Sequence, residues 1–180
     1  MQRTLEQVEQ ELHSRYPQAD LSPIASSFAF AVEAHGDQQR ISGEPYVSHP
    51  LAVAQILAEL GLDPVAVTAA FLHDVPEDTE YSLGDVEERF GADVARLVDG
   101  VTKLERIRFD SREEQQAASM RKMLVAMAKD LRVLVIKLAD RLHNMRTIQH
   151  LTPEQIERIS RETQPGSNWS VGSWPAASCR

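Results

Sequence analysis

A histidine and three carboxylates lie within six residues of one another between His73 and Asp78. His73 and Asp74 end an apolar run, and Glu77 and Asp78 follow directly after Pro76. Adjacent helical residues lie about 100° apart, so His73 and Asp74 can converge on one ion only beside a helix end. Imidazole plus carboxylate is a mixed donor set that suits Mn²⁺, Fe²⁺ or Zn²⁺. The stretch therefore predicts a metal site, with Glu77 or Asp78 placed to act as base on a water that the metal binds.

The alternative interpretation of this stretch is a solvated acidic loop after a buried helix. A second polar group, Asp140, Asn144 and Thr147, follows the spacing i, i+4, i+7 and forms one stripe on an otherwise apolar helix. A buried aspartate without a partner is costly. A metal would offset that cost, and so would an ion pair with Arg141 or Arg146.

Helical segments with short breaks between them must position these residues. The expected helices span residues 5–16, 21–35, 49–60, 63–74, 82–90, 92–104, 120–128 and 131–145. Pro76 lacks an N–H and cannot continue the fourth helix, so the backbone is expected to be released where Glu77 and Asp78 turn into the site. The last helix is apolar nearly all round and is expected to be buried. With no strand pair and no internal repeat, the class is all-α with eight or nine helices.

Two segments are expected to be loops. Residues 37–48 have no helical or strand period and carry turn residues, and loops of that length in a compact domain are often functional. Residues 106–116 are rich in charge and predict a mobile surface loop.

Composition bounds the class of protein. A chain of 180 residues with 42% hydrophobic and 26% charged residues fits one soluble globular domain. The aromatic content of 6% and the eight glycines argue against a β-sandwich or barrel. No apolar run approaches the ~18–20 residues that span a bilayer, and the N-terminus lacks the apolar core of a signal peptide. The single cysteine, Cys179, excludes an intrachain disulfide, and together these features predict a cytoplasmic protein.

Net charge bears on the partners. The formal net charge of −8 disfavours nucleic acid as a partner, because such binding needs clustered Lys and Arg. A polyanionic small substrate would also be repelled unless the site provides a local positive charge. A bound metal ion would provide it.

Four motifs follow one another along the chain. They are Arg40 with Ser48-His49-Pro50, His73-Asp74 with Glu77-Asp78-Thr79, Gly100-Val101-Thr102-Lys103, and residues 137–147. This series resembles the hydrolase domain of the RelA/SpoT family, HD-superfamily enzymes that degrade the alarmone (p)ppGpp. The likeness covers about residues 20–163. It implies an HD-domain helical bundle over residues 1–163, followed by a flexible tail, 164–180, that lies outside the family pattern.

The resemblance also implies roles for individual residues. The implied ligands of a metal, usually Mn²⁺, are His49, His73, Asp74 and Asp140. The implied catalytic pair that handles the attacking water is Glu77 and Asp78. The implied nucleotide contacts are Arg40, Ser42, Tyr46, Asn144 and Thr147. Three further histidines have no ligand role in that pattern and are interpreted as residues that pack in the core or contact a ligand residue: His35, His143 and His150.

The expected function is metal-dependent hydrolysis of ppGpp and pppGpp to GDP or GTP and pyrophosphate. The sequence contains no motif for phosphoryl transfer from ATP, because it has no Walker-type glycine-rich loop. One alternative is an HD phosphohydrolase on another nucleotide, such as the NADPH 2′-phosphatase activity linked to the small animal relatives. Others are a non-catalytic module that binds the alarmone and a pure interaction protein, although the latter must treat all four motifs as coincidence.

Two features depart from the family pattern. Ile41 stands where many members carry a basic residue associated with the guanine base, so base stacking is expected to be weaker. The tail of residues 164–180 is rich in Gly, Ser, Trp and Pro where long members continue helically toward a synthetase domain. The chain is therefore expected to degrade the alarmone only. Apolar surface normally covered by the missing helices would then need the two Trp side chains or a homo-oligomer to cover it.

Overall fold

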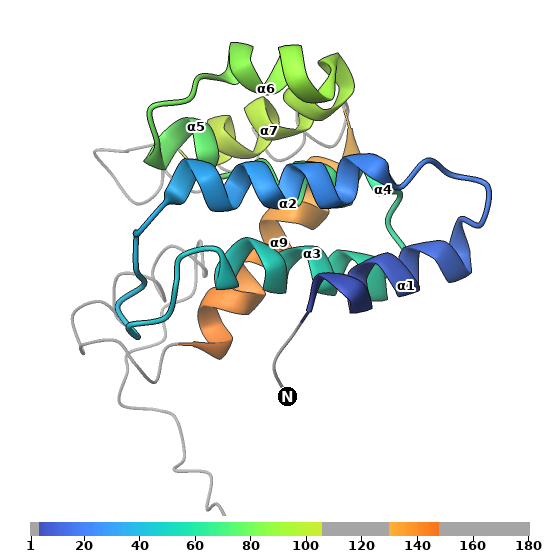
Figure 1. Cartoon of the computed structure of the whole chain (residues 1–180), viewed down its shortest axis with the longest axis horizontal. Coiled ribbons are helices and arrows are strands. Elements are labelled where there is room, and N and C mark those ends of the chain that lie inside the picture. Colours follow the sequence, from blue (N-terminus) through green and yellow to red (C-terminus); the bar gives the residue numbers. More distant parts are fainter. Residues whose placement is uncertain (1–3, 106–129, 148–180) are drawn as a thin grey trace, which may run out of the picture.

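The computed structural model describes residues 4–105 and 130–147, and within these ranges the chain forms helices and short connections (Figure 1). The helices are α1 (Leu5–Arg15), α2 (Ser22–His35), α3 (Ser48–Glu59), α4 (Pro64–Leu72), α5 (Val75–Asp78), α6 (Leu83–Phe90), α7 (Ala92–Glu105) and α9 (Leu131–Arg146). The nearest thing to strand pairing in the described ranges is an isolated antiparallel bridge between Gln39 and Pro45. The all-α prediction is therefore confirmed.

Local capping explains why the predicted helix boundaries agree closely with the structure. Thr4 and Ser82 each form a capping box at the start of α1 and α6, and the Asp63 and Asp130 side chains accept hydrogen bonds from the first turns of α4 and α9. Such bonds depend only on neighbours in sequence. The helix expected over 120–128, the loop over 106–116, His150 and the tail of 164–180 lie outside the described residues.

The junction after α4 differs from the prediction. Helix α4 ends at Leu72 with His73 as its C-cap, and the short helix α5 then carries Pro76 in its first turn. Proline is tolerated there because the first-turn N–H groups have no intrahelical partner. Glu77 and Asp78 therefore lie on a helical turn, and the expectation of a released backbone at Pro76 was wrong.

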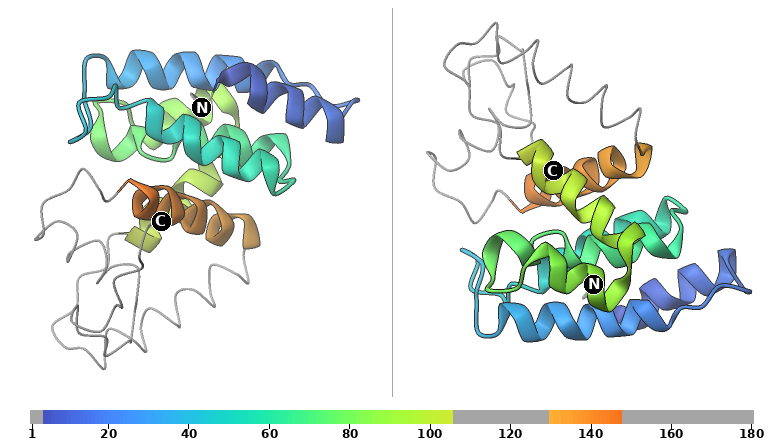
Figure 2. Two further views of the ribbon diagram at one scale, coloured as in Figure 1. Left: turned by 90° about the horizontal axis from the view of Figure 1, so that it is seen from below. Right: turned by 90° about the horizontal axis from the view of Figure 1, so that it is seen from above.

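Helix α4 lies at the centre of the fold. Its residues from Ala66 to Leu72 are all buried, and the helix contacts α2, α3, α7 and α9. Figure 2 shows α2 on one side of the α3–α4 pair and α9 on the other. This arrangement brings the start of α3, the end of α4 and the middle of α9 to one place.

Helix α9 packs against α3 and α7 but is not buried all round. Gly100 of α7 allows a close crossing, since a Cβ atom there would lie 2.7 Å from Cγ2 of Val133. Three leucines of α9 are nonetheless exposed, Leu138 by as much as 58%. The expectation of a fully buried helix was therefore wrong, because one of its faces meets no other described helix.

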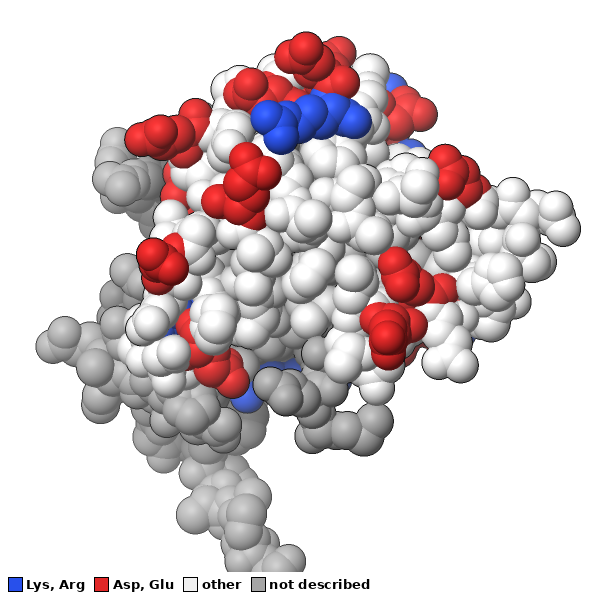
Figure 3. All heavy atoms as spheres, viewed as in Figure 1, with Lys and Arg blue, Asp and Glu red and all other residues white. Residues whose placement is uncertain are grey.

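The charged side chains on one face of the molecule are mainly acidic. The face shown in Figure 3 carries mainly Asp and Glu among uncharged residues. Within the described ranges no helix combines the length and apolar character that crossing a membrane requires.

Candidate metal centre and active site

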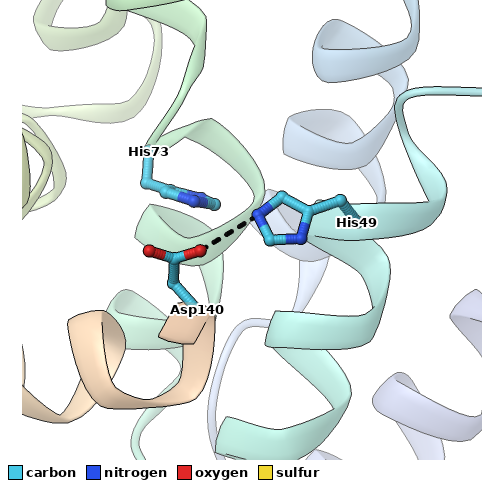
Figure 4. A group of neighbouring side chains, drawn as sticks. All are labelled: His49, His73 and Asp140. Atoms are coloured by element: carbon cyan, nitrogen blue, oxygen red, sulfur yellow. Dashed lines mark ion pairs between the residues drawn. The ribbon is translucent and has the colours of Figure 1, made fainter. Parts of the chain in front are cut away.

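Three buried side chains from three helices converge at the centre of the molecule (Figure 4). His49 comes from the first turn of α3, His73 from the C-cap of α4 and Asp140 from the middle of α9. They are only 2–4% exposed, and one potential ligand atom from each lies within 4.8 Å of the others. Residues far apart in sequence thus form one compact donor cluster.

Asp74 completes this cluster from the α4–α5 junction. Its Oδ1 lies 3.1 Å from Nε2 of His73, and its Oδ2 lies 3.6 Å from Nε2 of His49. The same His49 nitrogen lies 3.3 Å from Oδ1 of Asp140. Two imidazoles and two carboxylates therefore face one another, as a mixed N/O metal site requires. We refer to His49, His73, Asp74 and Asp140 as the donor cluster.

The ring of His73 is oriented as a metal ligand needs. Its Nδ1 lies 2.8 Å from the carbonyl oxygen of Ala70 and donates its proton there, so in the neutral ring Nε2 carries the lone pair. That Nε2 is buried and has no hydrogen-bond partner among the described residues. A buried nitrogen lone pair directed at carboxylates is costly unless a cation lies between them. The residues present therefore fit a divalent metal.

The electrostatics of the donor cluster also favour a cation. Burial raises the pKa of Asp140, but a hydrogen bond from His49 and the charge of Lys137 lower this pKa by more than burial raises it. The net pKa therefore lies well below the usual range. Burial likewise opposes the ionisation of Asp74, and His73 and His49 overcome it, so the pKa of Asp74 is lowered. At His73, burial lowers the pKa while Asp74 and Asp140 raise it, with a net increase. The two carboxylates thus stay ionised and attract positive charge.

Lys137 is the basic partner of Asp140. Its Nζ lies 2.8 Å from Oδ2 of Asp140, one helical turn away, and the lysine is itself only 8% exposed. The sequence suggested a metal, Arg141 or Arg146 as the group that offsets this buried charge, and the ion pair that the structure shows is with Lys137. On the other side, Nδ2 of Asn144 donates to Oδ1 of Asp140 at 2.7 Å. Both oxygens of Asp140 are therefore held in place.

Tyr46 joins the donor cluster to the proposed catalytic pair. Its hydroxyl lies 2.7 Å from Oδ2 of Asp78 and 2.9 Å from Oδ2 of Asp74, and its one proton can be donated to either carboxylate. Burial and the charges of Asp74 and Asp78 raise the pKa of Tyr46, so the hydroxyl remains a donor. The ring stacks on His35 with centroids 4.3 Å apart. Beside Asp78, one carboxylate oxygen of Glu77, Oε1, is buried.

Residues predicted to contact nucleotide meet where the loop of residues 37–47 approaches the end of α9. The Arg40 guanidinium donates to Oγ1 of Thr147 at 3.3 Å and, at 3.5 Å, reaches Oδ1 of Asn144. Ser42 instead donates to Glu44 within the loop at 3.3 Å. The structure thus brings Arg40, Asn144 and Thr147 together next to the donor cluster, and no hydrogen bond of Ser42 within the described ranges reaches it.

Comparison with known proteins agrees with this geometry. The family model described as HD domain matches residues 27–165. The chain belongs to the HD domain family. Its HD domain is similar in sequence to SpoT and similar in both sequence and fold to a SpoT orthologue.

Two curated relatives are much longer than this HD domain. A probable guanosine-3′,5′-bis(diphosphate) 3′-pyrophosphohydrolase of Synechocystis sp. is 54% identical over 141 residues, which are 78% of this chain and 19% of that protein. The bifunctional (p)ppGpp synthase/hydrolase SpoT of Escherichia coli K12 is 48% identical over 158 residues, which are 88% of this chain and 22% of that protein. The chain therefore spans about a fifth of the relatives' length.

A solved structure supports the same grouping of the HD domain. It is that of a metazoan orthologue of SpoT that hydrolyses ppGpp and plays a role in starvation responses. The TM-score is 0.59 at 32% sequence identity, and the match covers 78% of this chain and 81% of that one.

Two residues that contact the candidate site were not predicted from the sequence, and a third was predicted without a specific contact. Lys137 was not singled out as the partner of Asp140, although its i, i+3 spacing was a usable signal. Gln38 was not considered; its side chain contacts Nδ1 of His35 at 3.0 Å and donates to the backbone oxygen of Asp78 at 2.9 Å. His143 was interpreted only as a residue that packs in the core or contacts a ligand residue; its Nδ1 lies 2.8 Å from Nδ1 of His49, which is 94 residues away in sequence.

Proposed function

We propose that this chain is a divalent-metal-dependent hydrolase of ppGpp and pppGpp that releases pyrophosphate and leaves GDP or GTP. The observation that carries the proposal is the buried donor cluster with Tyr46, Asp78 and Glu77 beside it. The named activities of SpoT and of the similar pyrophosphohydrolase support this choice of substrate.

His49, His73, Asp74 and Asp140 would hold the metal. Mn²⁺ is the proposed ion, from the resemblance to RelA/SpoT hydrolases, and the mixed imidazole and carboxylate donors suit it. When bound, a divalent ion would lower the pKa of a water and offset the charge of the phosphates. Lys137 keeps Oδ2 of Asp140 occupied, so the Oδ1 atom is the one that faces His49.

The chain's own residues supply the base. Asp78 or Glu77 takes a proton from the attacking water as its oxygen bonds to phosphorus. The bond from that phosphorus to the ribose 3′ oxygen breaks, the 3′ oxygen acquires a proton, and pyrophosphate leaves. The Tyr46 hydroxyl lies within hydrogen-bond distance of both Asp78 and Asp74, and it therefore keeps the two carboxylates next to each other.

The nucleotide is proposed to bind between the loop of residues 37–47 and the end of α9. Arg40 supplies a cation on this side of the donor cluster, which a polyanionic substrate needs in a chain of net charge −8. Its bonds to Asn144 and Thr147 are long, at 3.5 and 3.3 Å, so a phosphate can replace them at little cost.

A substrate panel tests the proposal directly. Purified protein with Mn²⁺ is given ppGpp, pppGpp and NADPH, and released pyrophosphate and orthophosphate are measured separately. Pyrophosphate from the two alarmones, abolished by a chelator, is the expected result.

The same panel separates the alternatives. Orthophosphate from NADPH without pyrophosphate from ppGpp would identify an HD phosphohydrolase on another nucleotide. Alarmone binding without any product would identify a non-catalytic module, and either result would overturn the proposal.

A further inference from the structure

The two histidines of the donor cluster are held in different ways. His73 uses a backbone carbonyl, that of Ala70, as the partner of its Nδ1. His49 uses a side chain, since its Nδ1 lies 2.8 Å from Nδ1 of His143. His143 lies on α9 one turn after Asp140, so α9 carries both a residue of the donor cluster and the partner of another one.

The direction of this bond follows from the position of the two His49 nitrogens. Its Nε2 faces the carboxylates of Asp74 and Asp140, at 3.6 and 3.3 Å, so a metal in the donor cluster would need the lone pair on Nε2. The proton of neutral His49 then belongs on Nδ1, and Nδ1 of His143 must accept it. His143 in turn carries its own proton on Nε2.

We propose that His143 is a positioning residue that fixes the metal-binding tautomer and ring orientation of His49. The proposal rests on the proposed metal site. His49 is 3% exposed, so no bulk solvent is at hand to replace a lost partner of its Nδ1. Removing a partner of this kind from a metal-ligating histidine costs about 10–100-fold in metal affinity.

The placement of His143 also gives α9 a role in assembling the site. The two rings lie with centroids 5.0 Å apart, tilted by 38°, across the contact between α3 and α9. Docking of α9 on α3 therefore delivers Asp140 and orients His49 in one step. A shift of α9 would disturb both.

A matched pair of variants tests this role. In His143→Asn the Oδ1 atom stands where Nδ1 stood and can accept the same hydrogen bond, whereas His143→Leu has nearly the same shape and cannot accept it. We expect His143→Leu to raise the Mn²⁺ dissociation constant about 10–100-fold and His143→Asn to change it less than about threefold. His13→Leu, in the exposed last turn of α1, is the control and should bind Mn²⁺ as the parent chain does.

Titration of the metal-free proteins with Mn²⁺ alone, followed by isothermal calorimetry, measures these constants without any substrate. The melting temperature of each metal-free variant shows whether it folds, and His143→Ala replaces His143→Leu if the latter does not. Equal Mn²⁺ affinity of the Leu or Ala variant and the parent chain would overturn the proposal, as would an Asn variant no better than Leu.

A spectroscopic measurement reads the tautomer itself. In protein loaded with diamagnetic Zn²⁺, ¹⁵N chemical shifts should show a proton on Nδ1 of His49 and none on Nδ1 of His143. The reverse pattern would overturn the proposal. Neither measurement uses ppGpp, so a failure of the proposed substrate assignment would leave both results interpretable.

Discussion

At the scale of single residues, burial decides what an ion pair contributes. Lys137 and Asp140 form a buried pair, whereas Lys103 and Asp99 form a pair of similar length, 2.6 Å, at the surface. Breaking a buried pair by removing one partner costs about 3–5 kcal/mol, because it leaves an uncompensated charge. An exposed pair contributes about 0–1 kcal/mol.

Lys137→Met should therefore lower the melting temperature of the metal-free protein, and Lys103→Met should change it little. Mn²⁺ should stabilise the Lys137 variant more than the parent chain, because in the variant the ion offsets the negative charge of Asp140 that Lys137 no longer offsets. Thermal melts with and without Mn²⁺ check both statements. Equal sensitivity of the two lysine variants would contradict the argument from burial.

Substitutions of Glu77 and of Asp140 are predicted to have different effects on metal binding and turnover. Asp140→Ala removes a ligand and should lose the metal. Glu77→Gln is nearly isosteric but cannot accept a proton, so it should keep the metal and lower kcat by about 10²–10⁴-fold if Glu77 is the base. Metal content and turnover are measured on each variant, and equal loss of Mn²⁺ in both would make Glu77 a ligand or a structural residue.

Ile41 is predicted to limit nucleotide affinity. Its side chain is 60% exposed, so it does not pack under the loop and a lysine should not disturb the fold. A cation–π contact with a purine is worth roughly 0.5–2 kcal/mol, which is about 2- to 30-fold in affinity. Ile41→Lys should lower KM for ppGpp with little change in kcat. Steady-state kinetics with a parallel melt measures this, and an unchanged KM in an intact fold would contradict it.

At the scale of helices, the crossing of α7 and α9 depends on Gly100. A Cβ atom added there would lie 2.7 Å from Val133, whereas one at Gly84 of α6 would meet Ser82 at 3.4 Å. Overpacking costs about 1–3 kcal/mol, while alanine in an open helical position gains up to about 1 kcal/mol over glycine.

Gly100→Ala should therefore destabilise the protein by about 1–3 kcal/mol. Gly84→Ala should be neutral or slightly stabilising, and adding Val133→Ala to Gly100→Ala should recover part of the loss because it makes room for the new methyl group. Denaturant unfolding of the single and double variants measures these differences. Equal effects of the two glycine variants would mean that the helix crossing does not set the cost.

At the scale of the whole molecule, the donor cluster joins α3, the α4–α5 junction and α9. A metal held by all three should stabilise the fold as well as act in hydrolysis. At 100 times its dissociation constant the ion adds about 2.7 kcal/mol, which corresponds to a rise in melting temperature of roughly 5–10 °C for a domain of this size. Chelation should abolish hydrolysis and lower the melting temperature, and Mn²⁺ should restore both.

Full turnover in metal-free protein would show that the metal assignment is wrong.

A homo-oligomer and a cytoplasmic location stay predictions at this scale. Sedimentation of the purified chain would test the first of them.

The sequence by itself determined most of the helix starts in the part of the chain that the structure describes. Helix starts at Thr4, Asp63 and Ser82 follow from caps whose partners lie within three residues, so the pattern of the chain was enough to find them. The stripe of Asp140, Asn144 and Thr147 was likewise visible, because the helical period alone places these residues on one face. The resemblance to RelA/SpoT hydrolases then singled out the four residues of the donor cluster.

Only the tertiary structure decided which groups support that cluster. Lys137 and Asp140 are both buried and pair with each other. Which face of α9 is buried depends on how the helix packs against α3 and α7. His49 and His143 are 94 residues apart, and no local period relates them. Contacts of this kind depend on how helices dock, and docking is set by the shapes of the packed side chains, which a linear pattern of polar and apolar residues does not encode.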